Sequence, residues 1–111
     1  MSTTLSAALA SDPILVRVRR TLRALYGKRL ERAVLYGSHA RGDAGPESDY
    51  DIAVFLHDVT DRWAEMDRLA DLGTEVLYES GALVHAMAFP AGAWAARTPL
   101  MGEIRRDGVE L

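Results

Sequence analysis

The chain has 111 residues, 49% of them hydrophobic and 26% charged, with a formal net charge of −3 and no cysteine. This near-average composition excludes wholesale disorder, and the lack of cysteine excludes a disulfide framework, a thiolate zinc site and a cysteine nucleophile. No apolar stretch approaches the roughly 18 residues that a membrane span requires, so we expect no membrane partner. We predict a single domain over residues 1–111.

The N-terminal segment predicts a loose start followed by a helix. The first ten residues lack the basic and apolar regions of a secretory signal, so we expect a cytoplasmic protein with residues 1–11 flexible. Asp12 and Pro13 are typical of a helix cap and a first helical position. Apolar residues then recur at helical spacing as far as Gly27, which predicts an amphipathic helix over residues 13–27.

The rest of the chain alternates between strands and helices. Apolar runs and helical spacing predict strands over residues 33–36, 50–56 and 82–88 and helices over 60–80 and 99–108. Pro90 is expected to stop the third strand, and Thr98 with Pro99 to start the last helix. The expected fold class is α/β (α+β), with a small sheet of three to four strands packed against helices.

Asp49 and Asp51 indicate a metal site. The two residues are two positions apart on a predicted strand, so their side chains leave the same face, with Cα atoms roughly 6.6 Å apart. Two such carboxylates repel each other unless cations lie between them, although a lone Asp-x-Asp is also common at solvated strand edges. Mg²⁺ is typically held by one or two carboxylates together with substrate phosphates. The pair therefore predicts magnesium and a phosphate-bearing substrate.

Gly37 and Ser38 supply the complementary half of this site. A glycine at a strand end lets the backbone approach an anion closely, and the serine hydroxyl and nearby amides can donate hydrogen bonds to it. A helical turn beginning at Ser38 would add a favourable dipole. Arg41 is placed to bring a guanidinium to the same anion. Gly-Ser by itself is also an ordinary turn signal, and the functional interpretation depends on the joint pattern with the aspartates.

The joint pattern resembles a known signature. Gly37-Ser38, ten further residues and then Asp49-x-Asp51, with Arg41-Gly42 after the serine, is similar to the minimal nucleotidyltransferases of the polymerase-beta-like superfamily. The resemblance implies a mixed sheet of the polymerase-beta palm type. It also implies that Gly37 and Ser38 hold a nucleoside triphosphate, expected to be ATP, while Asp49 and Asp51 bind two Mg²⁺ ions and are catalytic. From the same pattern we assign Arg41 and Ser48 to nucleotide binding.

The chain departs from that family at one position. Members with full activity commonly carry a third acid on the next strand, and the strand predicted over residues 82–88 has none. His85 is the residue of this strand that would face the aspartates, and its neutral ring can bind a metal or accept a proton but cannot supply a third negative charge. The alternative role for His85 is an ordinary core or polar contact outside the site. A missing general base costs about 10²- to 10⁴-fold in rate. This departure favours a slow protein-modifying transferase or a domain that has lost activity.

In a chain of this length we expect no further acceptor-binding domain. Stand-alone domains of this kind resemble antitoxins paired with a HEPN ribonuclease toxin from an adjacent gene, which implies a hetero-oligomer and transfer of AMP to a toxin tyrosine. The alternatives are an antitoxin that neutralises its toxin by binding alone, and adenylylation of a small molecule with a partner subunit. The nucleotide base, the acceptor and the stoichiometry stay open.

Two charged helix faces and two tryptophans remain outside this site. Seven of the 13 basic residues fall within residues 17–32, yet interleaved aromatics are absent, so direct nucleic-acid binding is not expected. The exposed basic and acidic faces are expected to be solvated, with partner docking as the alternative. These faces comprise Arg17, Arg20 and Arg23, and Asp67, Asp71, Glu75 and Glu79. Trp63, placed on the buried stripe of the helix over 60–80, and Trp94 are expected to be core or interface anchors.

Overall fold

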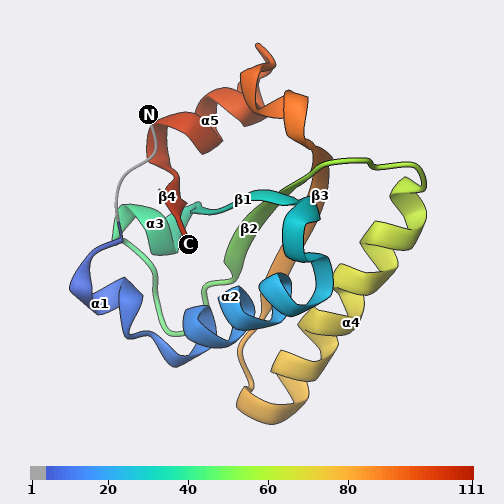
Figure 1. The fold of residues 1–111 in the computed structure, drawn as a ribbon. Coiled ribbons are helices and arrows are strands. Elements are labelled where there is room, and N and C mark those ends of the chain that lie inside the picture. The colour runs from blue at the N-terminus through green and yellow to red at the C-terminus, as the bar shows by residue number, and fades with distance from the viewer. Residues whose placement is uncertain (1–4) are drawn as a thin grey trace.

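The computed structural model describes residues 5–111 as a four-stranded sheet with helices on both faces (Figure 1). The α-helices are α1 (Ala7–Ala10), α2 (Pro13–Tyr26), α3 (Ser38–Arg41), α4 (Arg62–Ser80) and α5 (Pro99–Asp107). The strands are β1 (Leu30–Tyr36), β2 (Tyr50–Leu56), β3 (Val84–Pro90) and β4 (Val109–Glu110). The 3₁₀ helices are η1 (Gly27–Arg29) and η2 (Ala91–Ala95). The sequence predicts that residues 1–11 are flexible. Residues 1–4 of this segment lie outside the described residues, and α1 lies within the other seven.

The sheet has the strand order β3-β2-β1-β4. Strand β1 runs antiparallel to both β2 and β4, whereas β2 and β3 are parallel and are joined by α4. A parallel pair needs such a crossover connection, and a helix is the usual one. The sheet is therefore mixed, which confirms the expected fold class.

Helix α2 begins where the sequence predicts. Asp12 Oδ1 accepts a hydrogen bond from the Ile14 N–H at 2.8 Å, and Pro13 occupies the first turn. The helix ends at Tyr26, because Gly27 has a φ of 52° and leads the chain through η1 into β1. The buried side of α2 consists of Leu15, Val18, Leu22 and Tyr26. Leu25, predicted to lie on the same side, is 47% exposed.

Two apolar clusters hold the layers together. On one face of the sheet, α2 and α4 pack against side chains that include Leu35, Ile52 and Val54. On the other face, α5 and η2 pack against Val34 and Phe55. In Figure 1, α2 and α4 lie below the sheet and α5 above it. Because both faces of β1 and β2 are covered, these strands are apolar without alternation.

The strand boundaries differ from the sequence-based prediction at three places. β1 begins at Leu30, three residues early, because Glu31 and Arg32 lie at a bulged end of the strand where polar side chains reach solvent. β3 begins at Val84 and ends at Pro90, two residues later at each end than predicted, so the expectation that Pro90 stops the strand was wrong. Pro90 is tolerated because β3 is an edge strand and one side of its backbone needs no strand partner. The tail after α5 forms β4.

The orientation of α4 also differs from the prediction. Trp63, placed on the buried stripe, is 80% exposed, and Glu65 is 3% exposed in its place. The buried side chains are Glu65, Leu69, Leu72 and Val76. An acid can occupy this apolar side because Arg29 and Arg68 both donate hydrogen bonds to its carboxylate. Trp63 is thus not part of the core, and interface anchor remains its predicted role.

Close packing of α4 fixes the position of β3. A Cβ atom on Gly73 would lie 2.9 Å from the Val84 carbonyl oxygen, so the helix approaches the strand more closely than any other residue would allow.

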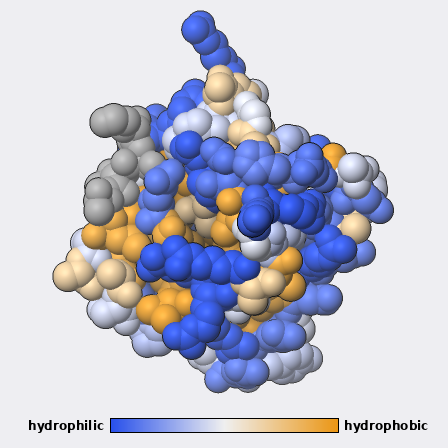
Figure 2. All heavy atoms as spheres, in the orientation of Figure 1, coloured by the Kyte–Doolittle hydropathy of each residue, from blue (hydrophilic) through white to orange (hydrophobic). Residues whose placement is uncertain are grey.

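Across residues 5–111 the helices are too short or too polar to cross a membrane. Figure 2 shows a surface on which hydrophilic side chains lie among patches of hydrophobic ones.

Candidate active site

The carboxylate of Asp51 lies in a row of three side chains that crosses the sheet. In the strand register, Asp51 on β2 is paired with Tyr36 at the end of β1 and with His85 on β3. Asp49 comes two residues before Asp51, just ahead of the first residue of β2, and is exposed. The antiparallel and parallel pairings therefore bring the end of β1 and the beginnings of β2 and β3 to one edge of the sheet.

Gly37 joins the glycine-serine turn to this row. It is buried, has a φ of 75° and directly follows β1. A Cβ atom at this position would lie 2.5 Å from Asp51 Oδ2, so the space that a side chain would need is already occupied by the carboxylate. The chain turns here into α3, whose first residue is Ser38. The first N–H groups of such a turn have no partner within the helix and are free to face a ligand.

Burial and neighbouring charges perturb Asp51. Desolvation raises the pKa of its carboxyl, the nearby His85 lowers it, and Asp49 and Glu103 raise it, with a net increase above the ordinary value. The effect of Asp49 on Asp51 has the direction of the repulsion that the sequence predicts for this pair. A cation between the two carboxylates would relieve this repulsion.

His85 lies within reach of the aspartate. Its Nδ1 atom is 3.7 Å from Asp51 Oδ1, and its side chain is 62% exposed. This distance is too long for a direct hydrogen bond but short enough for attraction when the imidazole is protonated. The sequence raised His85 as a residue that would face the aspartates, and the β2–β3 register brings the two side chains together.

Ser48 and His39 belong to the architecture of the loop. Ser48 Oγ accepts a hydrogen bond from the Gly45 N–H at 2.9 Å, and His39 Nε2 donates to the Ser48 carbonyl oxygen at 3.0 Å. The His39 ring stacks on Tyr50 with centroids 3.8 Å apart. These three residues line a hollow of about 500 Å³ together with the end of α4. Because Tyr50 and Asp51 alternate along β2, this hollow lies on the opposite side of the strand from the aspartate.

Arg41 is held by acids. Its side chain forms ion pairs with Asp43 at 3.2 Å and with Glu103 and Asp107 at 3.8 Å each. Two of these partners belong to α5, so Arg41 ties the turn after Ser38 to the C-terminal helix. A phosphate that recruits Arg41, as the sequence predicts, would have to compete with these carboxylates.

Tyr36 and Glu103 are site neighbours that sequence reasoning missed. The pKa of the Tyr36 hydroxyl is raised by burial first, then by the charges of Asp51 and Glu103. Both residues therefore lie in the same electrostatic environment as the aspartate. The register of β1 against β2 would have identified Tyr36, whereas no local pattern marks Glu103, which arrives from α5.

The residues at this site fit a hard divalent cation. Asp49 and Asp51 offer oxygen ligands, and their repulsion shows that the local charge is unbalanced. No group of three or more acidic, histidine or cysteine side chains within residues 5–111 is arranged to hold a metal ion. A cation at the pair would therefore need oxygen ligands from a substrate or from water, which is how Mg²⁺ is usually held.

The part of the chain that contains this site matches a known protein family. A family model described as the nucleotidyltransferase domain matches residues 15–93, from α2 to η2. The chain belongs to this family. The matched region contains the glycine-serine turn, both aspartates and His85, so this nucleotidyltransferase domain carries its candidate site within the part that defines the family. The resemblance inferred from the sequence is confirmed at the family level.

One curated relative extends the comparison. Over 66 residues the domain is 36% identical to a Methanocaldococcus jannaschii protein named "Putative protein adenylyltransferase MJ0604". The match covers 60% of this chain and 60% of that protein, so the domain spans less than two thirds of the relative's length.

Solved structures share the fold of this nucleotidyltransferase domain. A toxin–antitoxin crystallised with AMP-PNP has a TM-score of 0.62 and 23% identity, covering 86% of this chain and 69% of that one. A mutant of the toxin–antitoxin MntA-HpeT has a TM-score of 0.57 and 21% identity, covering 84% and 68%. At these identities the likeness establishes the fold.

Proposed function

We propose that this domain is an Mg²⁺-dependent adenylyltransferase that moves AMP from ATP to a tyrosine hydroxyl of a partner protein. The partner is a HEPN-family ribonuclease toxin encoded by an adjacent gene, and the domain acts as its cytoplasmic antitoxin in a hetero-oligomer. The observation that carries the proposal is the contact of Gly37 with Asp51, which joins the anion-binding turn to the carboxylate pair. The names of the curated relative and of the structural neighbours support the protein acceptor, the adenine nucleotide and the toxin partner.

Asp49 and Asp51 are the residues that would hold the magnesium ions. When bound, Mg²⁺ neutralises charge on the phosphates and polarises the phosphoryl group under attack. The two carboxylates contribute negative oxygens on one edge of the sheet, and burial together with nearby acids raises the pKa of Asp51. Cation binding is expected to favour its ionised form.

The glycine-serine turn would bind the triphosphate. Gly37 lets the backbone reach a phosphate because it has no side chain, and the Ser38 hydroxyl and the first N–H groups of α3 are hydrogen-bond donors. Arg41 and Ser48 are the further nucleotide-binding residues in the proposal. Arg41 would exchange its ion pairs with Glu103 and Asp107 for a phosphate.

In the proposed reaction the acceptor hydroxyl oxygen forms a bond to the α-phosphorus of ATP. The bond from that phosphorus to the bridging oxygen breaks, and pyrophosphate leaves. The hydroxyl proton goes to a base, and we assign this role to His85, which lies 3.7 Å from Asp51 and is exposed toward solvent. With a histidine where a third acid would otherwise lie, the reaction is expected to be slow, which suffices if each acceptor is modified only a few times.

A binding-only antitoxin is the second candidate. The observation that favours it is the lack of a carboxylate on β3, which leaves Asp51 on β2 and Asp49 just ahead of that strand as the acids of the proposed metal site. In this alternative the domain covers its toxin and the metal site is vestigial. Adenylylation of a small molecule with a partner subunit is a third hypothesis.

Labelled ATP distinguishes these functions. The domain would be incubated with α-labelled ATP, Mg²⁺ and the product of the adjacent gene, and the products analysed by mass spectrometry. The proposal expects a mononucleotide on a tyrosine of the neighbour, with CTP, GTP and UTP as comparisons for the base.

Asp51→Asn tests whether catalysis is needed for neutralisation. This variant should still form the complex but fail to silence the partner, while Asp67→Asn, an exposed acid on α4, should behave as wild type. Silencing by Asp51→Asn at wild-type strength would instead favour neutralisation by binding alone.

A further inference from the structure

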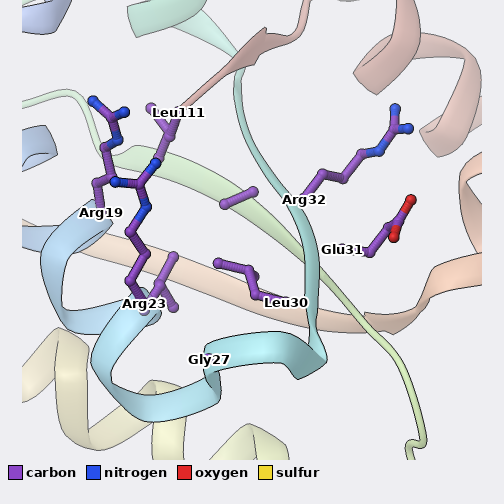
Figure 3. Close-up of a pocket in the computed structure, with 9 residues that line it drawn as sticks. Arg19, Arg23, Gly27, Leu30, Glu31, Arg32 and Leu111 are labelled. Carbon is purple, nitrogen blue, oxygen red and sulfur yellow. The ribbon is translucent and has the colours of Figure 1, made fainter.

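A basic groove lies at the opposite end of β1 from the candidate active site. Its volume is about 240 Å³, and it runs between the C-terminal half of α2 and the first residues of β1 (Figure 3). Apolar surface comes from Leu22, Leu30 and Ala33, and positive charge from Arg19 and Arg23. Because Gly37 follows the last residue of β1 and this groove borders the first ones, a ligand here would not occupy the aspartate site.

One wall of the groove is an incompletely paired strand edge. On the side away from β2, β1 pairs with β4 at Val34 and Leu35, and the Leu111 N–H donates to the Ala33 carbonyl oxygen at 2.9 Å. Within residues 5–111 no strand continues beside residues 30–32 on that side. An edge of this kind presents backbone donors and acceptors to any extended segment that lies along it.

The positive charge in the groove is unbalanced. Within residues 5–111, neither Arg19 nor Arg23 forms a salt bridge, and both are exposed. In Figure 3 their side chains lie close to each other beside Leu111, across the groove from Arg32.

The other charged residues of the groove already have partners. Arg32 pairs with Glu110 at 3.4 Å and lies over the Trp94 ring, 4.1 Å from its centroid. The Oε2 atom of Glu31 lies 2.7 Å from Nε2 of His57. The two α2 arginines therefore supply the charge that a ligand would meet.

We infer that this groove binds an acidic, extended segment of a partner protein, which adds to the sheet beside residues 30–32 in line with β4. The open edge of β1 would supply main-chain hydrogen bonds, and Arg19 and Arg23 would pair with carboxylates on alternate residues of the segment. Three residues of strand span about 10 Å, so the segment is short. This surface does not depend on the proposed transferase activity.

An acidic peptide fits better than other occupants. A second copy of the chain pairing through the same edge would bring two sets of Arg19 and Arg23 together, and like charges across an interface disfavour association. A nucleic acid would use the arginines but leave the backbone edge without partners, since phosphates offer no strand-like donors. The combination of an open edge with positive charge therefore favours a peptide.

The test is an NMR titration with the synthetic peptide Glu-Val-Glu-Val-Glu-Val-Glu. The expected result is a set of backbone amide shifts at residues 30–33 and along the second half of α2. Glu-Pro-Glu-Pro-Glu-Pro-Glu has the same charge but lacks alternate backbone donors, and it should bind at least fivefold more weakly. Arg23→Glu should weaken binding of the valine peptide about fivefold, because one attractive contact becomes repulsive.

Arg20→Glu is the matched control, because it makes the same charge change on an exposed position of the same helix that does not line the groove. It should alter affinity less than twofold, and well-dispersed amide spectra would show that each variant is folded. Equal weakening by Arg20→Glu, equal binding of the proline peptide, or shifts away from β1 would overturn the inference. Tighter binding of a ten-nucleotide uridine RNA to the same residues would overturn it in favour of nucleic acid.

Discussion

A Cβ atom on Gly37 would lie 2.5 Å from Asp51 Oδ2, so the glycine of the anion-binding turn and the carboxylate of the β2 pair occupy one shared space. Residues 14 positions apart are thereby made mutually dependent. The turn keeps its backbone conformation only if residue 37 tolerates a φ of 75°, and the carboxylate keeps its position only if residue 37 has no side chain. Each part of the candidate site thus restricts the other.

Gly37→Ala should destabilise the fold more than Gly42→Ala. Both glycines have positive φ, at 75° and 83°, but nothing lies within 4 Å of a Cβ on Gly42. Backbone strain should cost Gly42→Ala, in the left-handed helical region with a ψ of 13°, about 1 kcal/mol, and Gly37→Ala, with a ψ of −157°, about 2 to 3 kcal/mol. The clash with Asp51 should cost Gly37→Ala about 1 to 3 kcal/mol more. Urea unfolding measures the difference. In an Asp51→Ala background Gly37→Ala should cost less than in the wild type by the energy of that clash, while the cost of Gly42→Ala should not change. An unchanged cost of Gly37→Ala there would contradict the shared-space interpretation.

Asp51→Asn should keep or raise thermal stability at pH 7 while removing AMP transfer. The folded pKa of Asp51 is raised, chiefly by burial, so the fold favours the protonated form. The contribution of Asp51 to stability is therefore highest below the ordinary carboxyl pKa and falls as pH rises through the folded value. Asparagine keeps the shape without the charge, so its advantage over aspartate should vanish in acid. Melting curves from pH 3 to pH 8 test this sign, and a variant that melts well below wild type at pH 7 would refute it.

His85→Asp should raise the rate of AMP transfer about tenfold, because it adds a third carboxylate beside Asp51 on β3. Without Mg²⁺ the same change should lower the melting temperature, since a third negative charge joins an unbalanced pair. Mg²⁺ should then stabilise this variant more than wild type. His85→Asn is the control, because it removes the imidazole at the same position without adding a carboxylate. Lower activity together with an unchanged response to Mg²⁺ would show that residue 85 does not face the metal site.

Glu65→Gln should destabilise the domain by about 1 to 3 kcal/mol, because it leaves two arginines facing a neutral group on a buried side of α4. Burial acts to raise the pKa of Glu65, but hydrogen bonds from Arg29 and Arg68 outweigh it and lower the pKa overall. The stabilisation is thus present above the ordinary glutamate pKa and is lost as pH falls through the folded value. The wild-type advantage over Glu65→Gln should therefore shrink in acid. Glu75→Gln, an exposed change on the same helix, is the control. Its free energy of unfolding should stay within about 0.5 kcal/mol of wild type both at neutral pH and in acid.

Local chemistry explains what the sequence could predict. The Asp12-Pro13 and Thr98-Pro99 starts of α2 and α5 were correct to the residue, because a cap and its helix lie next to each other in the chain. The bounds of β2 were also correct, since its apolar run is flanked by turn residues. The spacing of Gly37, Ser38, Asp49 and Asp51 identified the family before any coordinates. The assignments of Arg41 and Ser48 to the nucleotide stay predictions.

Contacts between distant segments explain what only the tertiary structure decided. The burial of Glu65 and the exposure of Trp63 depend on Arg29, which lies 36 residues away along the chain from Glu65. The row of Tyr36, Asp51 and His85 depends on the register of β1 and β3 against β2, and the sequence had suggested only the last of these neighbours. Spacing along a chain specifies which side chains share an element and a face. The packing of the whole core decides which elements lie side by side and in what register. No short motif contains this information.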